Sequence, residues 1–183
     1  DEVAYSVRET DDGGFIIAAN TSSYGAGYWD IYLIKVDKNG NSEWTKTIGG
    51  NNDDRCYAIE QTIDGGFIIA GTTLSFGTEY YNIYLIKTDR NGNEVWAKIF
   101  GGSGGDYAYA VQETEDGGFI ICGDSQSFSA GGYTDVYLIK TDNSGNLLWS
   151  KTYGGPSNEG GKAISQTTDG GYIIAGITQG FSA

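Results

Sequence analysis

Short runs of apolar residues alternate with glycine-containing polar turns along the whole chain, and no window has the spacing of an amphipathic helix. In residues 51–102 this pattern predicts four strands, at 58–62, 67–72, 83–88 and 95–99. Asp64-Gly65-Gly66 joins the first two strands, and Asn91-Gly92 joins the last two. Both turns suit hairpins, because Gly and Asn tolerate a positive φ. The segment therefore predicts a four-stranded antiparallel sheet.

The same pattern occurs four times. An Asp-Gly-Gly-(Phe/Tyr)-Ile-Ile motif places its second glycine at residues 14, 66, 118 and 171, with spacings of 52, 52 and 53 residues. A Tyr-Leu-Ile-Lys segment and a tryptophan follow with the same period, the latter at Trp44, Trp96 and Trp149. A period near 50 residues with four strands per repeat is typical of propeller blades. The predicted fold class is therefore an all-β, β-propeller architecture of four-stranded antiparallel blades.

Dividing the chain by this period predicts a single, partial propeller over residues 1–183. It contains blades at 1–50, 51–102 and 103–155 and a half blade at 156–183. Three and a half blades do not close a ring, so strand edges and an apolar blade face would stay open. This predicts a structural module that associates either with other copies of itself or with further blades of a longer chain. The sequence leaves both alternatives open.

The order of the motifs resembles kelch-like propeller repeats, although here the glycine pair precedes the second strand, whereas in kelch it follows that strand. A closer resemblance is to repeats of bacterial and archaeal surface proteins, which read Asp-Gly-Gly-(Phe/Tyr)-Ile-Ile-Ala-Gly, then Tyr-Leu-Ile-Lys-Thr-Asp, Asn-Gly-Asn and Trp. The resemblance covers the whole chain and implies a propeller fold. It also implies an extracellular or cell-surface location, and no particular activity.

The charge balance limits the partners. Twenty-four acidic against 11 basic residues give a net charge of −13. A polyanion is repelled by nucleic acid and by anionic membranes, whereas cations, neutral sugars and basic proteins remain compatible partners. No apolar run approaches the roughly 20 residues of a membrane-spanning helix. We therefore expect no nucleic-acid binding and no membrane insertion.

Catalytic motifs are missing from the sequence. The chain has no histidine, which is the commonest general base and metal ligand. It also has no Gly-x-Ser-x-Gly elbow. Cys56 and Cys122 stand where other repeats have Ala or Gly, so we interpret both as small buried residues. The sequence therefore predicts a protein that is not an enzyme.

The longer connections between strands two and three lie at the opposite end of each blade from the tight turns. Variable loops on a rigid scaffold often carry binding residues. Aromatic side chains there could stack on sugar rings, while carboxylates and amides accept hydroxyl hydrogen bonds. Alternatively, loop aromatics such as Tyr24, Phe76 and Phe128 fill gaps between blades. The ligand-binding candidates are Tyr28, Trp29, Asp30, Tyr80, Tyr81, Asn82, Tyr133 and Asp135. They predict, as the alternative to assembly, a carbohydrate-binding or adhesion module whose partners are glycans or surface proteins.

One repeat position always carries an acid, namely Glu2, Asp54, Asp106 and Glu159. Gathered at one end of the blades, Asp54, Asp106 and Glu159 are candidates for a Ca²⁺ site. The alternative is that each acid accepts backbone N–H hydrogen bonds within a loop. The turn at 37–41 and its equivalents lack the spacing of a calcium-binding loop. No cofactor other than this possible Ca²⁺ is expected.

Overall fold

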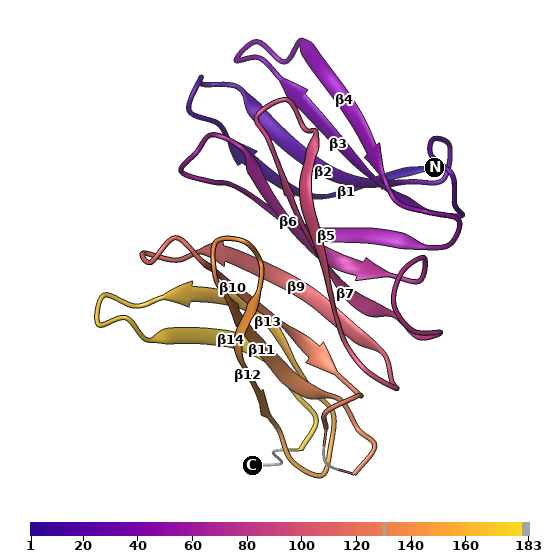
Figure 1. Cartoon of the computed structure of the whole chain (residues 1–183), viewed down its shortest axis with the longest axis vertical. Helices are drawn as coiled ribbons and strands as arrows, with labels where there is room; N and C mark the ends of the chain where they lie inside the picture. Colours follow the sequence, from indigo (N-terminus) through magenta and orange to yellow (C-terminus); the bar gives the residue numbers. More distant parts are fainter. Residues whose placement is uncertain (130, 181–183) are drawn as a thin grey trace.

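The computed structural model describes residues 1–129 and 131–180, in which every regular element is a β-strand (Figure 1). Three four-stranded antiparallel sheets follow one another, and a two-stranded sheet comes last. This confirms the prediction of an all-β chain with three complete blades and a half blade. The strands of the first two sheets are β1 (Glu2–Glu9), β2 (Phe15–Thr21), β3 (Asp30–Val36), β4 (Ser42–Ile48), β5 (Asp54–Gln61), β6 (Phe67–Thr73), β7 (Asn82–Thr88) and β8 (Glu94–Phe100). Those of the last two are β9 (Asp106–Glu113), β10 (Phe119–Ser125), β11 (Asp135–Thr141), β12 (Leu147–Tyr153), β13 (Glu159–Gln166) and β14 (Tyr172–Thr178).

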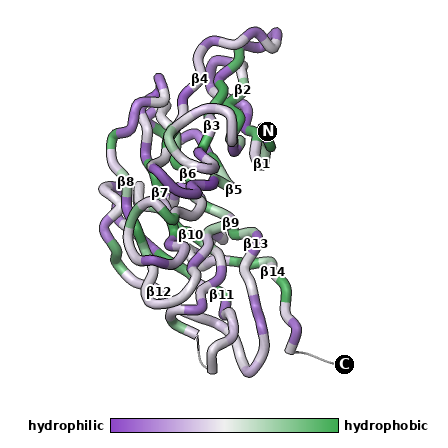
Figure 2. Tube along the Cα trace, turned by 90° about the vertical axis from the view of Figure 1, so that its right-hand side faces the viewer, coloured by the Kyte–Doolittle hydropathy of each residue, from purple (hydrophilic) through white to green (hydrophobic). Residues whose placement is uncertain are grey.

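Each sheet is a simple meander, in which neighbouring strands in the sequence are neighbours in the sheet. The first strands of successive blades, β1, β5, β9 and β13, contact one another and so form the inner side of the arrangement. The sheets stack in chain order between the two termini (Figures 1 and 2). This places all Asp-Gly-Gly turns at one end of the blades and all connections between strands two and three at the other.

The first strands are longer than the sequence pattern predicted. The strand expected at 58–62 begins at Asp54 instead, and it contains a register shift between Cys56 and Ala58. The extra residue of such a bulge is Tyr57, and it breaks the alternation that marks a strand in the sequence. Equivalent shifts flank Tyr5 in β1 and Lys162 in β13.

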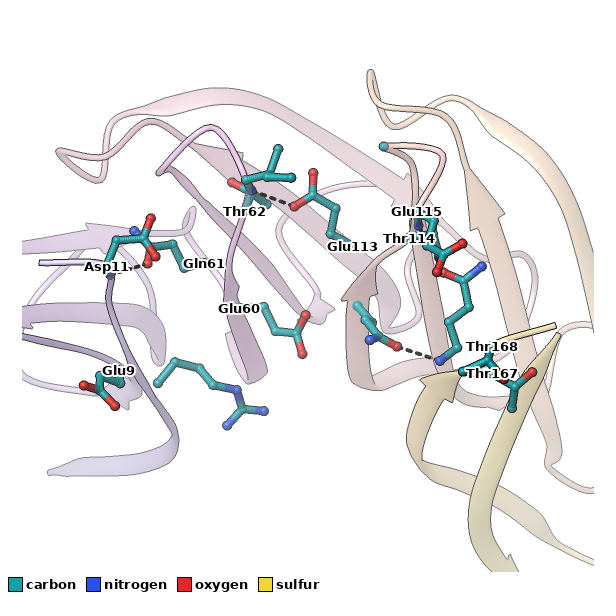
Figure 3. Close-up of a pocket in the computed structure, with 15 residues that line it drawn as sticks. Glu9, Asp11, Glu60, Gln61, Thr62, Glu113, Thr114, Glu115, Thr167 and Thr168 are labelled. Atoms are coloured by element: carbon teal, nitrogen blue, oxygen red, sulfur yellow. Dashed lines mark hydrogen bonds between the residues drawn. The ribbon is translucent and has the colours of Figure 1, made fainter. Parts of the chain in front are cut away.

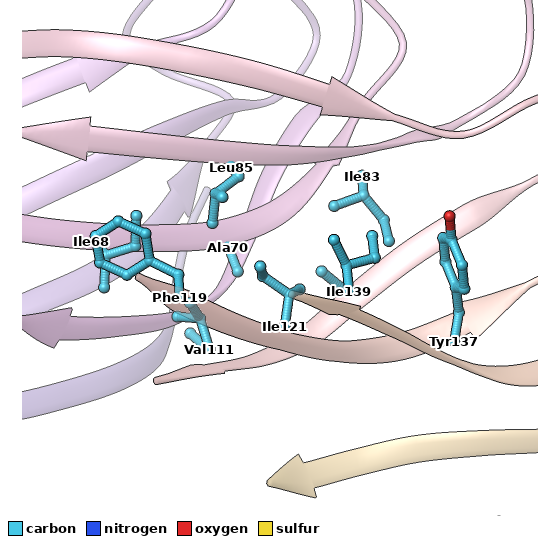
Figure 4. Packing of buried hydrophobic residues seen from close by; sticks show 11 residues of the cluster. Ile68, Ala70, Ile83, Leu85, Val111, Phe119, Ile121, Tyr137 and Ile139 are labelled. Carbon is cyan, nitrogen blue, oxygen red and sulfur yellow. The ribbon is translucent and has the colours of Figure 1, made fainter. Parts of the chain in front are cut away.

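The core lies between blades, because the second and third strands of the middle blade, β6 and β7, bury side chains on both of their faces. Ile68 and Leu85 of the second blade pack against Phe119 and Ile121 of the third (Figure 4). A matching cluster joins the first blade to the second, and a smaller one joins the third blade to the half blade. Cys56 and Cys122 lie in these clusters as free, buried thiols, so the interpretation of both as small buried residues is confirmed.

In every complete blade a buried lysine of the third strand is bound to the turn between the first and second strands. Lys35, Lys87 and Lys140 each pair with the aspartate of their own Asp-Gly-Gly turn, at 2.9 to 3.0 Å. Hydrogen bonds from Thr114, Lys140 and the N–H of Gly118 lower the pKa of Asp116 to about 2. The lysine of the Tyr-Leu-Ile-Lys segment is therefore part of the turn's structure and not a solvent-facing charge.

Candidate functional site

A cleft of about 730 Å³ lies at the Asp-Gly-Gly end, where the first strands of neighbouring blades converge (Figure 3). The sequence predicts no ligand site at this end, because each single turn is too tight to hold a ligand. The cleft instead forms between the turns of different blades, which the sequence of one repeat does not show. Its polar lining comes from Arg8, Glu9, Asp11, Glu60, Gln61, Gln112, Glu113, Glu115 and Gln166 together with four threonines.

Much of this polar lining is used to hold neighbouring blades together. Gln61 accepts a hydrogen bond from the Asp11 N–H at 2.8 Å, and Glu113 accepts one from the Ile63 N–H at 2.8 Å. Gln166 in the half blade accepts a third from Glu115 N–H at 3.1 Å. Figure 3 shows Gln61 and Glu113 reaching from their own blades toward the turn of the previous blade. The last residues of β5, β9 and β13 thus hold their blades to the preceding blades.

The rest of the cleft is acidic. Burial raises the pKa of Glu60 and outweighs two lowering effects, namely the charge of Arg8 and a hydrogen bond from the Glu113 backbone. Carboxylates and amides of this kind suit a cationic or polyhydroxylated ligand. The signal that would have located the cleft is the polar pair at the end of each first strand, as in Glu60-Gln61 and Gln112-Glu113.

A row of tyrosines crosses the blades at the bulges. The rings of Tyr5 and Tyr57 lie 5.3 Å apart, and those of Tyr57 and Tyr109 also lie 5.3 Å apart. Lys162 takes the same position in the half blade, with Nζ 3.3 Å from the centre of the Tyr109 ring. Its ammonium also pairs with Asp124 at 3.3 Å. The extra residues at the bulges of β1, β5, β9 and β13 therefore contact one another from blade to blade.

At the opposite end, the structure separates the predicted ligand-binding residues into three groups. Tyr28 is 75% exposed, and Tyr80 and Tyr133 at the same repeat position are 46% and 45% exposed. Trp29 and Tyr81 are half-buried. The polar candidates Asp30, Asn82 and Asp135 are buried at the start of their third strands. Among these candidates the first group is the most exposed.

Trp29 and Tyr81 belong to one contact network, although they come from different blades. The guanidinium of Arg55 lies 5.3 Å from the centre of the Trp29 ring and pairs with Asp53 at 3.0 Å. Tyr81 donates a hydrogen bond to the same Asp53 at 3.0 Å, and its ring packs on Tyr107. Burial, followed by this hydrogen bond, raises the pKa of Tyr81 to about 12. These contacts hold the two loops together at the junction of the blades.

The acids that occupy one position of each repeat accept hydrogen bonds in the loops that join successive blades. Asp54 accepts one from Ser75 at 2.6 Å and another from the Gly50 N–H at 2.6 Å. Asp106 and Glu159 accept the N–H of Gly102 and of Gly155, each at 3.0 Å. These are the loop-capping contacts that the sequence offered as the alternative to a Ca²⁺ site. Within residues 1–129 and 131–180, no three acidic or cysteine side chains are grouped so that they could hold a metal ion.

Two buried acids, Asp30 and Asp54, lie close together where the first blade meets the second. Asp30 accepts a hydrogen bond from the Gly27 N–H at 3.0 Å, whereas its Oδ1 has no hydrogen-bond partner among the described residues. Asp30 and Asp54 both lie against Gly49, where a Cβ would meet an oxygen of each. Burial raises the pKa of Asp30, and the charge of Asp54 raises it further. In the second blade the equivalent residue is an amide, Asn82.

No protein-family model matches the sequence, and no curated protein matches it significantly. Among solved structures, the fold is similar to that of a protein of unknown function from Bacteroides caccae, with a TM-score of 0.55 and 11% sequence identity. The match covers 94% of this chain and 52% of that one, so this chain spans about half the length of its structural match. At this identity the likeness concerns the fold. No helix of a length and apolarity sufficient to cross a membrane occurs in the described part of the chain.

Proposed function

We propose that the protein is a non-enzymatic, extracellular structural module whose two open ends associate with further blades. These blades come from other copies or from a longer chain. The observation that carries the proposal is Phe15, which is 38% exposed on the first blade. At the same repeat position, Phe67 and Phe119 are 1% and 2% exposed, because the next blade toward the N-terminus covers them.

The internal junctions show what covers such a face. Trp44 of the first blade packs on Phe67 of the second, with 6.0 Å between ring centres. Its ring also lies against Gly92, where a Cβ would come within 2.7 Å of it. On the first blade the matching Gly40 has nothing within 4 Å of its Cβ position. The face of the first blade that contains Phe15 and Gly40 therefore resembles the face of the second blade, but no tryptophan covers it among the described residues.

The two ends are complementary to each other. Phe15 lies on the face that packs toward a preceding blade, whereas Ile173 of the half blade, 63% exposed, lies on the face that packs toward a following one. Contact between unlike ends is a heterologous interface, which produces either closed rings or open filaments. The resemblance of the repeat to those of bacterial and archaeal surface proteins supports an extracellular location, and a chain without histidine supports a non-catalytic role.

Light scattering across a range of concentrations tests assembly. We expect a native mass above the 19.6 kDa of the chain that rises with concentration. Phe15→Glu should reduce the mass to that of one chain, because it puts a charge on the N-terminal face. Val95→Glu is the matched control, since Val95 is 61% exposed on the outer strand of the middle blade. A mass of 19.6 kDa at every concentration, or an equal effect of both variants, contradicts the proposal.

A carbohydrate-binding or adhesion role is the second candidate, and the exposed Tyr28, Tyr80 and Tyr133 support it. Tyrosines that keep free ring surface can stack on sugar rings. Binding should quench the fluorescence of neighbouring Trp29, and Tyr28→Ala with Tyr80→Ala should abolish that quenching. Tyr153→Ala serves as the control, because Tyr153 is 53% exposed on β12, outside these loops. A glycan array without any bound sugar would remove this candidate.

A further inference from the structure

Two carboxylates from different blades converge inside the molecule where the first blade joins the second. Asp30, at the start of β3, is 1% exposed, and Asp54, at the start of β5, is completely buried. Oδ1 of Asp30 and Oδ2 of Asp54 both lie within 3.0 Å of the point where a side chain at Gly49 would begin. The stacking of the two blades therefore creates the pair, which neither blade contains by itself.

The hydrogen bonds around the pair leave one oxygen without a partner. Oδ2 of Asp54 accepts the Ser75 hydroxyl and the Gly50 N–H, each at 2.6 Å. Asp30 accepts the Gly27 N–H at Oδ2, whereas its Oδ1 has no hydrogen-bond partner among the described residues. A buried carboxylate oxygen without a donor is costly, so Oδ1 requires either a cation or a proton beside it.

No basic side chain neutralises the two acids. Neither Asp30 nor Asp54 forms an ion pair with a lysine or arginine of residues 1–129 and 131–180. Arg55 follows Asp54 in the sequence, but it pairs with Asp53 instead. Two like charges held close together in a buried position repel each other. The pair is therefore a place where bound positive charge stabilises the protein.

The same arrangement of oxygen atoms occurs at the next two junctions between blades. At Gly101 the converging oxygens are Oδ1 of Asn82 and Oδ2 of Asp106, and at the glycine of the third junction they belong to Asp135 and Glu159. Carboxylate and amide oxygens are ligands that Ca²⁺ prefers. An amide oxygen donates no proton, so a cation explains the exchange of Asp for Asn at this position more simply than a proton that two carboxyl groups share.

A groove between the first two blades leads to the pair. It has a volume of about 610 Å³, and its lining includes Ile48, Gly49 and Phe76. Gly49 also lies against both carboxylates, where a side chain would meet the oxygens of Asp30 and Asp54. An ion that enters this groove therefore reaches the acids past a residue without a side chain.

We propose that a Ca²⁺ ion binds between Asp30 and Asp54 and joins the first blade to the second. The sequence pattern indicated Asp54 as a Ca²⁺ candidate, and the structure adds Asp30 from the neighbouring blade. Two carboxylates balance the charge of the ion, and main-chain carbonyl groups and water complete the shell of Ca²⁺ in such sites. With two carboxylates we expect a Kd of about 10⁻⁴ to 10⁻³ M, as in extracellular modules. This inference goes beyond the proposed assembly function, because both acids belong to one chain.

The test uses the full chain after treatment with a chelator, in about 0.15 M NaCl to screen the diffuse attraction of cations to the acidic surface. Adding CaCl₂ to about 10 mM should raise the thermal unfolding midpoint by about 3 to 8 °C. In ¹⁵N–¹H spectra the amide signals of Gly27 and Gly50, whose N–H groups bind the two acids, should shift and saturate as Ca²⁺ is added.

Asp30→Asn should abolish the shifts at Gly27 and Gly50 and should reduce the gain in midpoint. The fold accepts an amide here, since the equivalent residue of the second blade is Asn82. Without Ca²⁺ this variant should be more stable than the parent chain, because one of two buried like charges is removed, and Ca²⁺ should narrow the difference.

Asn82→Asp is the reverse exchange and builds the same acid pair at the second junction. It should gain a Ca²⁺-dependent shift at the amide of Gly102, whose N–H binds Asp106. Glu79→Gln is the matched control, because it removes an equal charge from an exposed loop. This variant should respond to Ca²⁺ as the parent chain does.

The inference is overturned if the Gly27 and Gly50 signals of the parent chain stay in place in Ca²⁺, in which case the two acids share a proton instead. Shifts that persist in Asp30→Asn would contradict it too. An equal rise in midpoint for the parent, Asp30→Asn and Glu79→Gln would indicate diffuse binding of cations to the surface, and it would also refute the site. None of these results depends on whether the chain assembles.

Discussion

Lys87 Nζ lies 3.0 Å from both carboxylate oxygens of Asp64, although the two residues are 23 positions apart. The same ammonium donates a hydrogen bond to the Thr88 carbonyl group at 2.9 Å. This ion pair joins the two most regular motifs of the repeat, the Asp-Gly-Gly turn and the Tyr-Leu-Ile-Lys strand. The lysine lies where a side chain at Gly66 would begin, so the aspartate, the second glycine and the lysine depend on one another.

Gly66→Ala should therefore destabilise the protein by about 2 kcal/mol or more, since the new methyl group collides with a backbone carbonyl that cannot move freely. Urea unfolding followed by tryptophan fluorescence measures the change. Gly171→Ala is the matched control and should change the free energy of unfolding by less than about 0.5 kcal/mol. Equal effects at the two positions would contradict the steric explanation.

Asp64→Ala should cost about 2 kcal/mol, because it leaves the buried ammonium of Lys87 without its counter-ion. This lies below the cost of breaking a fully buried pair, since Asp64 is largely exposed and water screens part of the interaction. In a double-mutant cycle with Lys87→Met, the double variant should lose less stability than the sum of the single losses. Additive losses would show that the two residues are not coupled.

Acidification should destabilise the fold through these turns. Burial pushes the pKa of Asp64 upward, but hydrogen bonds from Thr62, the Gly66 N–H and Lys87 outweigh it and lower the pKa to about 2. Because the folded-state pKa is below the ordinary 3.8, the stabilisation is present above that pH and is lost as the pH falls toward about 2. Urea unfolding at pH 6, 4 and 2.5 measures it. Asp64→Asn should show a flatter dependence on pH.

Asp30 should have the opposite pH dependence. Its pKa is raised in the folded state, chiefly by burial, so the carboxyl group favours folding at low pH and opposes it once both states are ionised. Asp30→Asn should therefore raise the free energy of unfolding by about 1 kcal/mol at pH 7. The gain should vanish below pH 3.8, the ordinary pKa. Asn82→Asp, the reverse exchange in the second blade, should destabilise the protein at pH 7.

The two cysteines should be unreactive in the folded protein. Burial raises the pKa of both Cys56 and Cys122 to about 12, so almost no thiolate forms at pH 8. Iodoacetamide at pH 8 should leave the native chain unmodified and should add two carbamidomethyl groups after denaturation, as intact mass would show. Rapid labelling of the native chain would mean that these junctions open.

Strand order and turn positions were predictable because glycine and aspartate act locally, through the backbone conformations that they permit. Gly65 and Gly92 illustrate this, since both have a positive φ, at 81° and 73°. The start of β5 was not predictable, because the bulge at Tyr57 interrupts the alternating pattern. The burial of Asp30 and Asn82 was also missed, since a polar residue after a loop looks the same in the sequence whether it faces solvent or caps the loop.

The repeat, the four strands of each complete blade and their antiparallel order can be derived from the sequence, because they follow from local turn chemistry and from apolar runs of strand length. Which polar residues are used between blades depends on the packing of the blades against one another. Gln61 and Glu113 hold neighbouring blades together, and Lys87 is a buried counter-ion of Asp64. These differences arise from contacts between residues distant in the sequence, and each contact depends on whether a neighbouring strand is present to complete it.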